Sequence, residues 1–210
     1  MSAYGPDQLA RDLGVSRETT ERLEAYRRLL AEASARMNLV GPREIENYWR
    51  RHALDCGQLV CLAPAAKRWA DLGSGAGFPG IVIACLLADI PGAMVHLVEA
   101  TGKKARFLEE AARAIGLPAK VFACRIEQFG AGESPYDVVA ARALAPLPRL
   151  IGHAKPILDR GAQGLFHKGA GLDAELAAAK TALEGGAFQV DVLESLSDPR
   201  GRVLRITKAA

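Results

Sequence analysis

The stretch from Trp69 to Gly80, WADLGSGAGFPG, constrains the fold of this chain more than any other. An apolar run leads into it, glycines then alternate with small residues, and Pro79 opens a helical pattern. This order predicts a strand, a tight turn and the N-terminus of a helix. Glycine adopts positive φ without a Cβ penalty and lets a ligand approach the backbone closely. The stretch therefore predicts a nucleotide-cofactor site.

From Lys67 onward, short apolar runs alternate with helical patterns. Such alternation is typical of βαβ units and a parallel sheet, so we expect an α/β fold. The expected strands are residues 68–72, 94–99, 120–124, 136–141, 164–167, 188–193 and 202–206, and the last two are expected to pair antiparallel. The expected helices between them are residues 79–88, 101–115, 148–158 and 172–183, with Thr101 as a cap.

The first 50 or so residues read as helical and have no glycine-rich turn of their own. Ser16 is expected to cap a helix with one apolar face, and residues 47–62 read as a further helix. A chain of 210 residues suits one sizeable core better than two. We therefore expect an N-terminal helical extension over residues 1–62 and one compact α/β domain over residues 63–210.

Composition and charge exclude several classes of protein. The longest apolar run, residues 81–88, is far below the ~20 residues that span a bilayer, and the N-terminus lacks a signal pattern, so we expect a cytoplasmic protein with no membrane partner. The four cysteines and four histidines have no metal-ligand spacing, so no metal site is expected. The net charge of +3 is small, but five basic residues stand against one acid in residues 142–168, which permits a basic face.

The glycine-rich stretch matches both dinucleotide and S-adenosylmethionine sites. The GxGxxG pattern over Gly75–Gly80 is a weak signal, and the bulky Phe78 and Pro79 stand inside a turn that would have to approach a pyrophosphate. Asp71 is expected to anchor the turn or to face a methionyl ammonium. Glu99 is expected to accept ribose hydroxyls, which both cofactors carry. We favour S-adenosylmethionine and keep two alternatives, a nicotinamide-dependent oxidoreductase and a purely structural turn.

The segment after the strand at 136–141 limits which atom such an enzyme would methylate. Amine methylation usually shows an Asp/Asn-Pro-Pro-aromatic loop here, and pyrimidine C5 methylation a Pro-Cys pair, but the chain reads ARALAP and contains no Pro-Cys. Guanine N7 has a free lone pair and needs no general base. Arg142 suits this chemistry by pairing with the cofactor's carboxylate or by donating to guanine O6. No general base is assigned, and the catalytic residue is left unknown.

Five motifs occur in the order and spacing of a known family. They are Asn38-Leu39, Arg51–Asp55 (RHALD), Asp71–Gly80 (DLGSGAGFPG), Arg142–Ala145 (RALA) and Lys168-Gly169. From about Asn38 to its C-terminus the chain resembles the bacterial 16S rRNA guanine-N7 methyltransferase G family, glucose-inhibited division protein B. The resemblance implies a class I S-adenosylmethionine-dependent methyltransferase fold, which is Rossmann-like with a mostly parallel seven-stranded sheet whose last strand is antiparallel. Residues 63–210 would then be the methyltransferase domain.

The resemblance also implies the substrate, N7 of a guanine in the 530 loop of 16S rRNA. As partners we expect 16S rRNA or a small-subunit assembly, and we expect the enzyme to be a monomer. By position it places cofactor contacts at Gly73, Phe78, Ile126, Glu127 and Arg142. With the residues that the turn itself indicates, the expected cofactor site is Asp71, Gly73, Gly75, Gly77, Phe78, Glu99, Ile126, Glu127 and Arg142.

Three further residues are predicted to contact RNA: Arg51, His52 and Lys168. For His52 and Lys168 a purely structural role has about equal weight, because a lone histidine more often packs and a lysine is often only solvated. A methyltransferase that acts on a small molecule or a protein remains the alternative within the enzymes.

Overall fold

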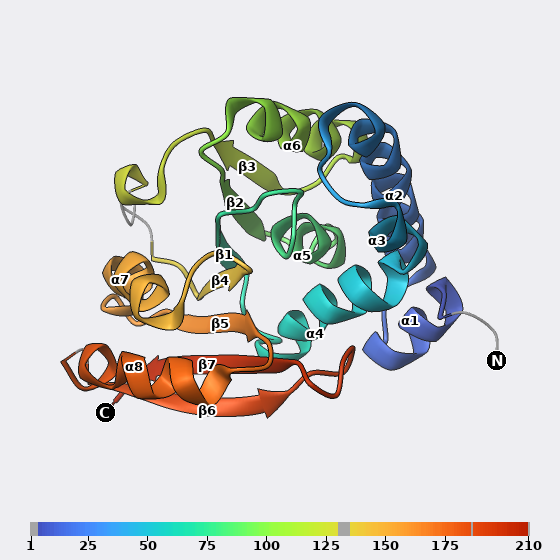
Figure 1. Cartoon of the computed structure of the whole chain (residues 1–210). Coiled ribbons are helices and arrows are strands. Elements are labelled where there is room, and N and C mark those ends of the chain that lie inside the picture. Colours follow the sequence, from blue (N-terminus) through green and yellow to red (C-terminus); the bar gives the residue numbers. More distant parts are fainter. Residues whose placement is uncertain (1–3, 130–134, 186, 210) are drawn as a thin grey trace.

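A sheet of seven strands runs through the computed structural model, which describes residues 4–129, 135–185 and 187–209 (Figure 1). The strands are β1 (Arg68–Leu72), β2 (Met94–Val98), β3 (Ala119–Phe122), β4 (Val138–Arg142), β5 (Gln163–Lys168), β6 (Phe188–Glu194) and β7 (Arg202–Lys208). Their order is β3-β2-β1-β4-β5-β7-β6, and only the pairings of β7 with β5 and β6 are antiparallel among those described. This topology confirms the class I methyltransferase fold.

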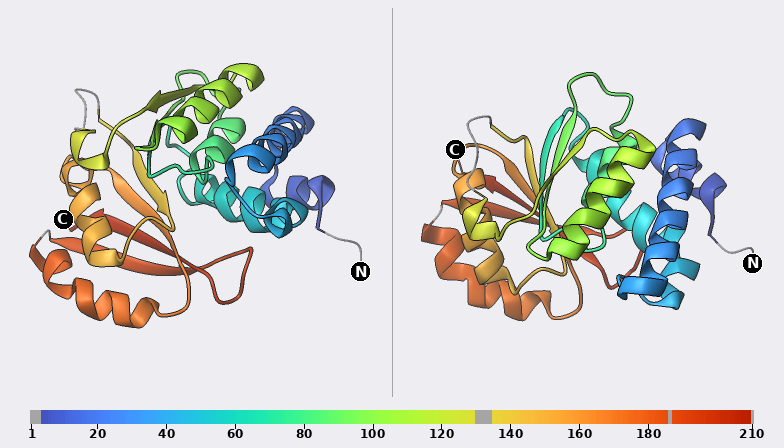
Figure 2. Two further views of the ribbon diagram at one scale, coloured as in Figure 1. Left: turned by 45° about the horizontal axis from the view of Figure 1, so that its top comes forward. Right: turned by 90° about the horizontal axis from the view of Figure 1, so that it is seen from above.

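Helices cover both faces of the sheet (Figure 2). They are α1 (Pro6–Leu13), α2 (Arg17–Met37), α3 (Pro42–Glu46), the π-helical turn η1 (Trp49–Leu54), α4 (Asp55–Leu62), α5 (Gly80–Leu86), α6 (Gly102–Ile115), the 3₁₀ turn η2 (Ile126–Gln128), α7 (Leu147–Leu158) and α8 (Leu172–Gly185). One core cluster joins α2, α4, α5 and α6 to one face, and a second joins α7 and α8 to the other. Alternate residues of β1 serve the two clusters, because successive strand side chains point to opposite faces.

The N-terminal half differs in detail from the sequence-based expectation. Residues 47–62 form two elements, η1 and α4, and not one regular helix. Ser16 caps α2 as predicted, because its Oγ accepts from the Thr19 backbone N–H at 3.2 Å. Thr101 occupies the N-cap position of α6 but makes no side-chain cap bond; its backbone N–H donates to Glu99 at 2.7 Å. No helix in the described part of the chain is both long and apolar enough to cross a bilayer.

The N-terminal helices pack directly beneath the glycine-rich turn. Tyr26 of α2 is fully buried, and its hydroxyl donates to the carbonyl oxygen of Ala76 in that turn. Its ring also lies 6.0 Å from the Phe78 ring, centroid to centroid, in an edge-on arrangement. Burying an aromatic body with a satisfied hydroxyl stabilises such a contact. The helical extension therefore supports the predicted cofactor site as well as the common core.

Gly77 provides a test of this packing. Its φ is +92°, and an added Cβ would collide with the Tyr26 hydroxyl and lie 2.8 Å from Ile81 Cγ1. Gly92 has a φ of +79° but open space around the same position. We expect Gly77→Ala to lower the free energy of unfolding by about 2–5 kcal/mol, as backbone strain and overpacking add, and Gly92→Ala by about 1 kcal/mol. Urea denaturation of both variants measures this difference, and equal losses would contradict it.

Candidate active site

A pocket of about 920 Å³ opens at the carboxyl ends of β1, β2 and β4. In the sheet, β2 lies on one side of β1 and β4 lies on the other side, so the strand order reverses at β1. Open α/β sheets bind ligands at such a reversal of strand order. We call it the first pocket. Seven of the nine predicted cofactor residues line it: Gly73, Gly75, Phe78, Glu99, Ile126, Glu127 and Arg142. The structure thus brings together residues that are 69 positions apart in the chain, from 73 to 142.

Asp71 and Gly77, the other two predicted residues, lie outside this lining. Asp71 is fully buried, and its Oδ2 accepts from the Gly80 backbone N–H at 3.0 Å. Burial raises the pKa of Asp71 to about 7, despite the hydrogen bonds from Ser74 and Gly80. Of the two roles expected for Asp71, the geometry supports the anchoring of the turn. Gly77 serves the close packing against Tyr26 described above.

Several backbone N–H groups of the turn are bonded within the protein. Glu99 accepts from Gly75 at 2.9 Å, Asp71 accepts from Gly80, and the Ser74 carbonyl oxygen accepts from Gly77 at 2.7 Å. In dinucleotide enzymes, groups at this position face the pyrophosphate. Since carboxylates of the protein itself already occupy two of them, the turn fits a cofactor without phosphate better than a dinucleotide.

The donor set of the first pocket suits S-adenosylmethionine. The backbone N–H groups of Gly75 and Thr101 hold the two carboxylate oxygens of Glu99 at 2.9 and 2.7 Å, which leaves lone pairs for ribose hydroxyls. Phe78 and Ile126 line the pocket with apolar surface and Arg142 lines it with a cation, a set that suits a ligand with an apolar part and a carboxylate. Among the described residues no group of His, Cys, Asp and Glu is arranged to hold a metal ion.

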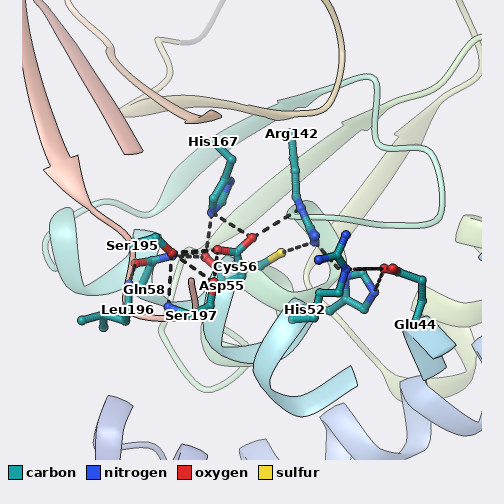
Figure 3. Close-up of polar contacts among 11 residues, drawn as sticks. Glu44, His52, Asp55, Cys56, Gln58, Arg142, His167, Ser195, Leu196 and Ser197 are labelled. Atoms are coloured by element: carbon teal, nitrogen blue, oxygen red, sulfur yellow. Dashed lines mark hydrogen bonds and ion pairs between the residues drawn. The ribbon is translucent and has the colours of Figure 1, made fainter. Parts of the chain in front are cut away.

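Arg142, at the carboxyl end of β4, is held by one segment of the N-terminal helices (Figure 3). Its Nη1 lies 2.7 Å from His52 Nδ1 and 3.6 Å from Cys56 Sγ, and its Nε lies 3.4 Å from Asp55 Oδ2. The side chain is only 17% exposed and lies over the Phe78 ring at 5.7 Å. The three partners come from η1 and the first turn of α4, whose junction turns all of them toward β4. Such π-turns are frequent at functional sites.

His52 is part of this arrangement and is not a surface residue, since it is 3% exposed. Its ring stacks on Phe78 with centroids 4.1 Å apart, and its Nε2 lies 2.9 Å from Glu44 Oε2. Arginine always donates, so Nδ1 of His52 is the acceptor and carries no proton. Burial and the nearby Arg142 charge lower the pKa of His52 to about 4. This packing agrees with the structural role of His52, which lines the first pocket at its buried side. The predicted contact of His52 to RNA stays a prediction.

A second pocket of about 1200 Å³ adjoins the first. Arg51, Arg142 and residues 143–145 line both of them. The side chain of Arg51 is 56% exposed and pairs with Glu44 at 2.8 Å, so it stands at the surface between the two pockets. This placement agrees with the predicted contact to RNA but does not test it.

Lys168 lines the second pocket, yet its side chain is only 8% exposed. Its Nζ donates to the Ala145 carbonyl oxygen at 2.9 Å and to Glu175 Oε2 at 2.6 Å. The same Glu175 oxygen accepts from the Leu147 backbone N–H at 2.7 Å. In this structure the charge of Lys168 braces the loop between the two pockets, which agrees with the structural role. The predicted contact of Lys168 to RNA stays a prediction.

Several residues of this site are not among those predicted from the sequence. Asp55 and Cys56 lie one helical turn after His52, and the spacing of 52, 55 and 56 on one helix face was a signal available in the sequence. His167, Ser195 and Ser197 come from β5 and from the segment after β6, and nothing local in the sequence links them to Asp55.

The lowered pKa of His52 makes the site sensitive to acid in a defined range. The unfolded chain protonates this group near pH 6.5 but the folded chain only near pH 4, so its contribution to stability is lost as the pH falls between those values. We expect the NMR signal of the His52 ring, assigned with a His52→Gln variant, to keep its neutral position from pH 7.5 down to pH 5.5. A midpoint near pH 6.5 would contradict this.

Comparison with known proteins agrees with the geometry. A family model described as "GidB: rRNA small subunit methyltransferase G" matches residues 19–203. The ribosomal RNA small subunit methyltransferase G of Parvibaculum lavamentivorans is 50% identical over 193 residues, covering 91% of this chain and 84% of the relative. The enzyme of the same name from Rhodospirillum rubrum is 47% identical over 202 residues, covering 96% of each.

Solved structures with low sequence identity show the same fold. A variant of MtNAS in complex with S-adenosylmethionine has a TM-score of 0.60 at 18% identity, covering 100% of this chain and 86% of that one. A ribosomal protein L11 methylase from Lactobacillus delbrueckii has a TM-score of 0.58 at 21% identity, covering 74% and 77%. On the family model and the full-length relatives, this chain belongs to the GidB family of rRNA small subunit methyltransferases G.

Proposed function

We propose that this protein transfers the methyl group of S-adenosylmethionine to N7 of a guanine in the 530 loop of 16S rRNA. Its family sets the reaction and the class of substrate, methylation of small-subunit rRNA. The observation that carries the proposal is the position of Arg142, which lines both the first pocket and the adjoining second pocket. A methyl donor in the first pocket and a base in the second would meet beside this side chain.

The chemistry requires little beyond correct positioning. The sulfonium of S-adenosylmethionine supplies an electrophilic methyl group; the N7 lone pair forms the new N–C bond as the S–C bond breaks, and no proton leaves N7. His52, the nearest histidine to Arg142, has its Nδ1 lone pair engaged by the guanidinium at 2.7 Å and is not free to take a proton.

Among the contacts of the described residues, Arg142 has one nitrogen left for a ligand. Nη1 faces His52 and Cys56, and Nε faces Asp55, so Nη2 is the group that remains. Its two N–H donors suit the cofactor's carboxylate and guanine O6, and a contact to O6 alone leaves N7 open to methylation. Both roles that the sequence leaves open for Arg142 therefore stay within reach of the same nitrogen.

The second pocket is the substrate side in this proposal. Arginines at positions 50, 51, 200 and 202 line it, against the acids Asp55, Glu175 and Asp198, each of which has a basic or hydroxyl partner in the protein. The side chain of Arg200 is 85% exposed. Such a rim attracts RNA phosphates while the base itself enters the pocket.

We include in the proposal that the enzyme acts as a monomer in the cytoplasm, on 16S rRNA or on a small-subunit assembly. An rRNA substrate supports that location, and no membrane-crossing helix is found among the described residues. Sedimentation of the active enzyme measures the oligomeric state.

The specific position of methylation can be tested directly. Mapping 7-methylguanine in 16S rRNA from cells with and without the gene should show one modified guanine in the 530 loop that is lost on deletion. A plasmid copy of the gene should restore it, and an Arg142→Gln copy should not. A 530 loop that is the same in both strains would refute the assigned position. Methylation of another acceptor by the purified enzyme would then identify the substrate.

Arg51 tests the substrate side. We expect Arg51→Ala to weaken binding of 16S rRNA and to reduce the slope of log K against log salt by about one, because one phosphate contact is lost. Cofactor affinity, measured by calorimetry, should stay unchanged. Arg17→Ala removes the same charge from an exposed α2 ion pair remote from both pockets and is the control. Equal effects of the two substitutions, or loss of cofactor binding in Arg51→Ala, would contradict the assignment.

A further inference from the structure

We propose that Asp55 is a positioning residue whose two carboxylate oxygens serve the two pockets separately. Oδ2 holds Arg142 in place, and Oδ1 holds the β6–β7 loop, residues 195–201, against the start of α4. The inference goes beyond the proposed function, and only its kinetic readout rests on that function.

The contacts of Oδ1 all concern the β6–β7 loop and its neighbour on α4. Ser197 Oγ donates to it at 2.6 Å, Ser195 Oγ at 3.1 Å and Gln58 Nε2 at 3.1 Å. Gln58 also accepts from the Leu196 backbone N–H at 2.9 Å. Figure 3 shows the contacts to the loop, which join residues 137 or more positions apart in the chain. The loop lines the second pocket.

The contacts of Oδ2 concern the strand ends. Arg142 Nε lies 3.4 Å away, and His167 Nε2 lies 3.7 Å away. His167 Nε2 also lies 2.7 Å from the Asp55 backbone carbonyl oxygen, so β5 is tied to α4 at the same point. Burial by itself raises the pKa of Asp55, but the neighbouring His167 and Arg142, with the serine hydroxyls, lower it overall. Asp55 is therefore a buried carboxylate that faces a buried guanidinium.

A buried cation without its counter-charge is costly, so loss of the Asp55 charge should displace Arg142. Asp55→Asn keeps one oxygen that can accept from the serines, and with the oxygen in that position its NH2 group faces Arg142. The double variant Ser195→Ala with Ser197→Ala does the reverse, because it removes both hydroxyl donors to Oδ1 and keeps the carboxylate. The loop is then held only by the bonds of Gln58 to Leu196 and of Arg50 to the Ser197 carbonyl oxygen among the described contacts. The two changes thus separate the roles of Oδ1 and Oδ2.

The first test uses no substrate. The Nε–H signal of Arg142, assigned by its loss in Arg142→Gln, should be protected from solvent exchange in the wild-type protein and in the serine variant. It should broaden or exchange in Asp55→Asn. A protected signal in Asp55→Asn would overturn the inference, whether or not the proposed substrate is right. Circular dichroism and the thermal midpoint verify that each variant is folded.

The second test is a double-mutant cycle on methyl transfer to 16S rRNA and on cofactor binding. We expect Asp55→Asn to lower kcat/KM at least about tenfold, in the range for a hydrogen bond to a charged group. In the Arg142→Gln background, Asp55→Asn should lower kcat/KM by less than about a further twofold, because both substitutions remove the same interaction. The serine variant should raise KM for RNA and leave cofactor Kd and kcat unchanged.

Independent, multiplying losses from Asp55→Asn and Arg142→Gln would overturn the inference, as would a serine variant that binds cofactor weakly. If Asp55→Asn does not fold, the serine variant still decides the role of Oδ1 through its separation of KM from kcat. Failure of the wild-type protein to methylate 16S rRNA would count against the proposed function alone, because the exchange of Arg142 is measured without RNA.

Discussion

The buried guanidinium of Arg142 determines how the parts of this molecule meet. A cation that is 17% exposed requires hydrogen-bond partners and a counter-charge within the protein. These partners of Arg142 are His52, Asp55 and Cys56. All three come from the helices that precede β1 in the chain and not from the sheet. The N-terminal helices are therefore part of the site, in addition to being a cover for one face of the sheet.

A similar constraint acts at the glycine-rich turn. Its N–H groups must find acceptors, and they find Glu99, Asp71 and the carbonyl oxygen of Ser74. Because carboxylates from β1 and the end of β2 fill these positions, the turn is a support for the first pocket and not an open anion site. This arrangement accounts for a phosphate-free cofactor in an otherwise Rossmann-like fold, and it places the carboxylate of Glu99 at the pocket wall.

Two residues that the sequence marks as RNA contacts have other partners in the structure. His52 lies between Phe78, Arg142 and Glu44, and Lys168 holds the loop after β4 through Ala145 and Glu175. Both belong to the motifs that carry the family resemblance. A motif marks a residue as important to the site, but whether its side chain faces solvent or the interior depends on neighbours distant in sequence.

The sequence by itself determined the strand-turn-helix around residues 69–80, the alternation of strands and helices, and the acid after β2, because these follow from local periodicity and backbone preference. It also identified the family through five ordered motifs. Tertiary structure alone decided that Asp71 lies beneath the turn and that Asp55 joins β4, β5 and the segment after β6. Those contacts span up to 142 residues, and no local pattern encodes which buried charge will meet which partner once the chain is closed into one core.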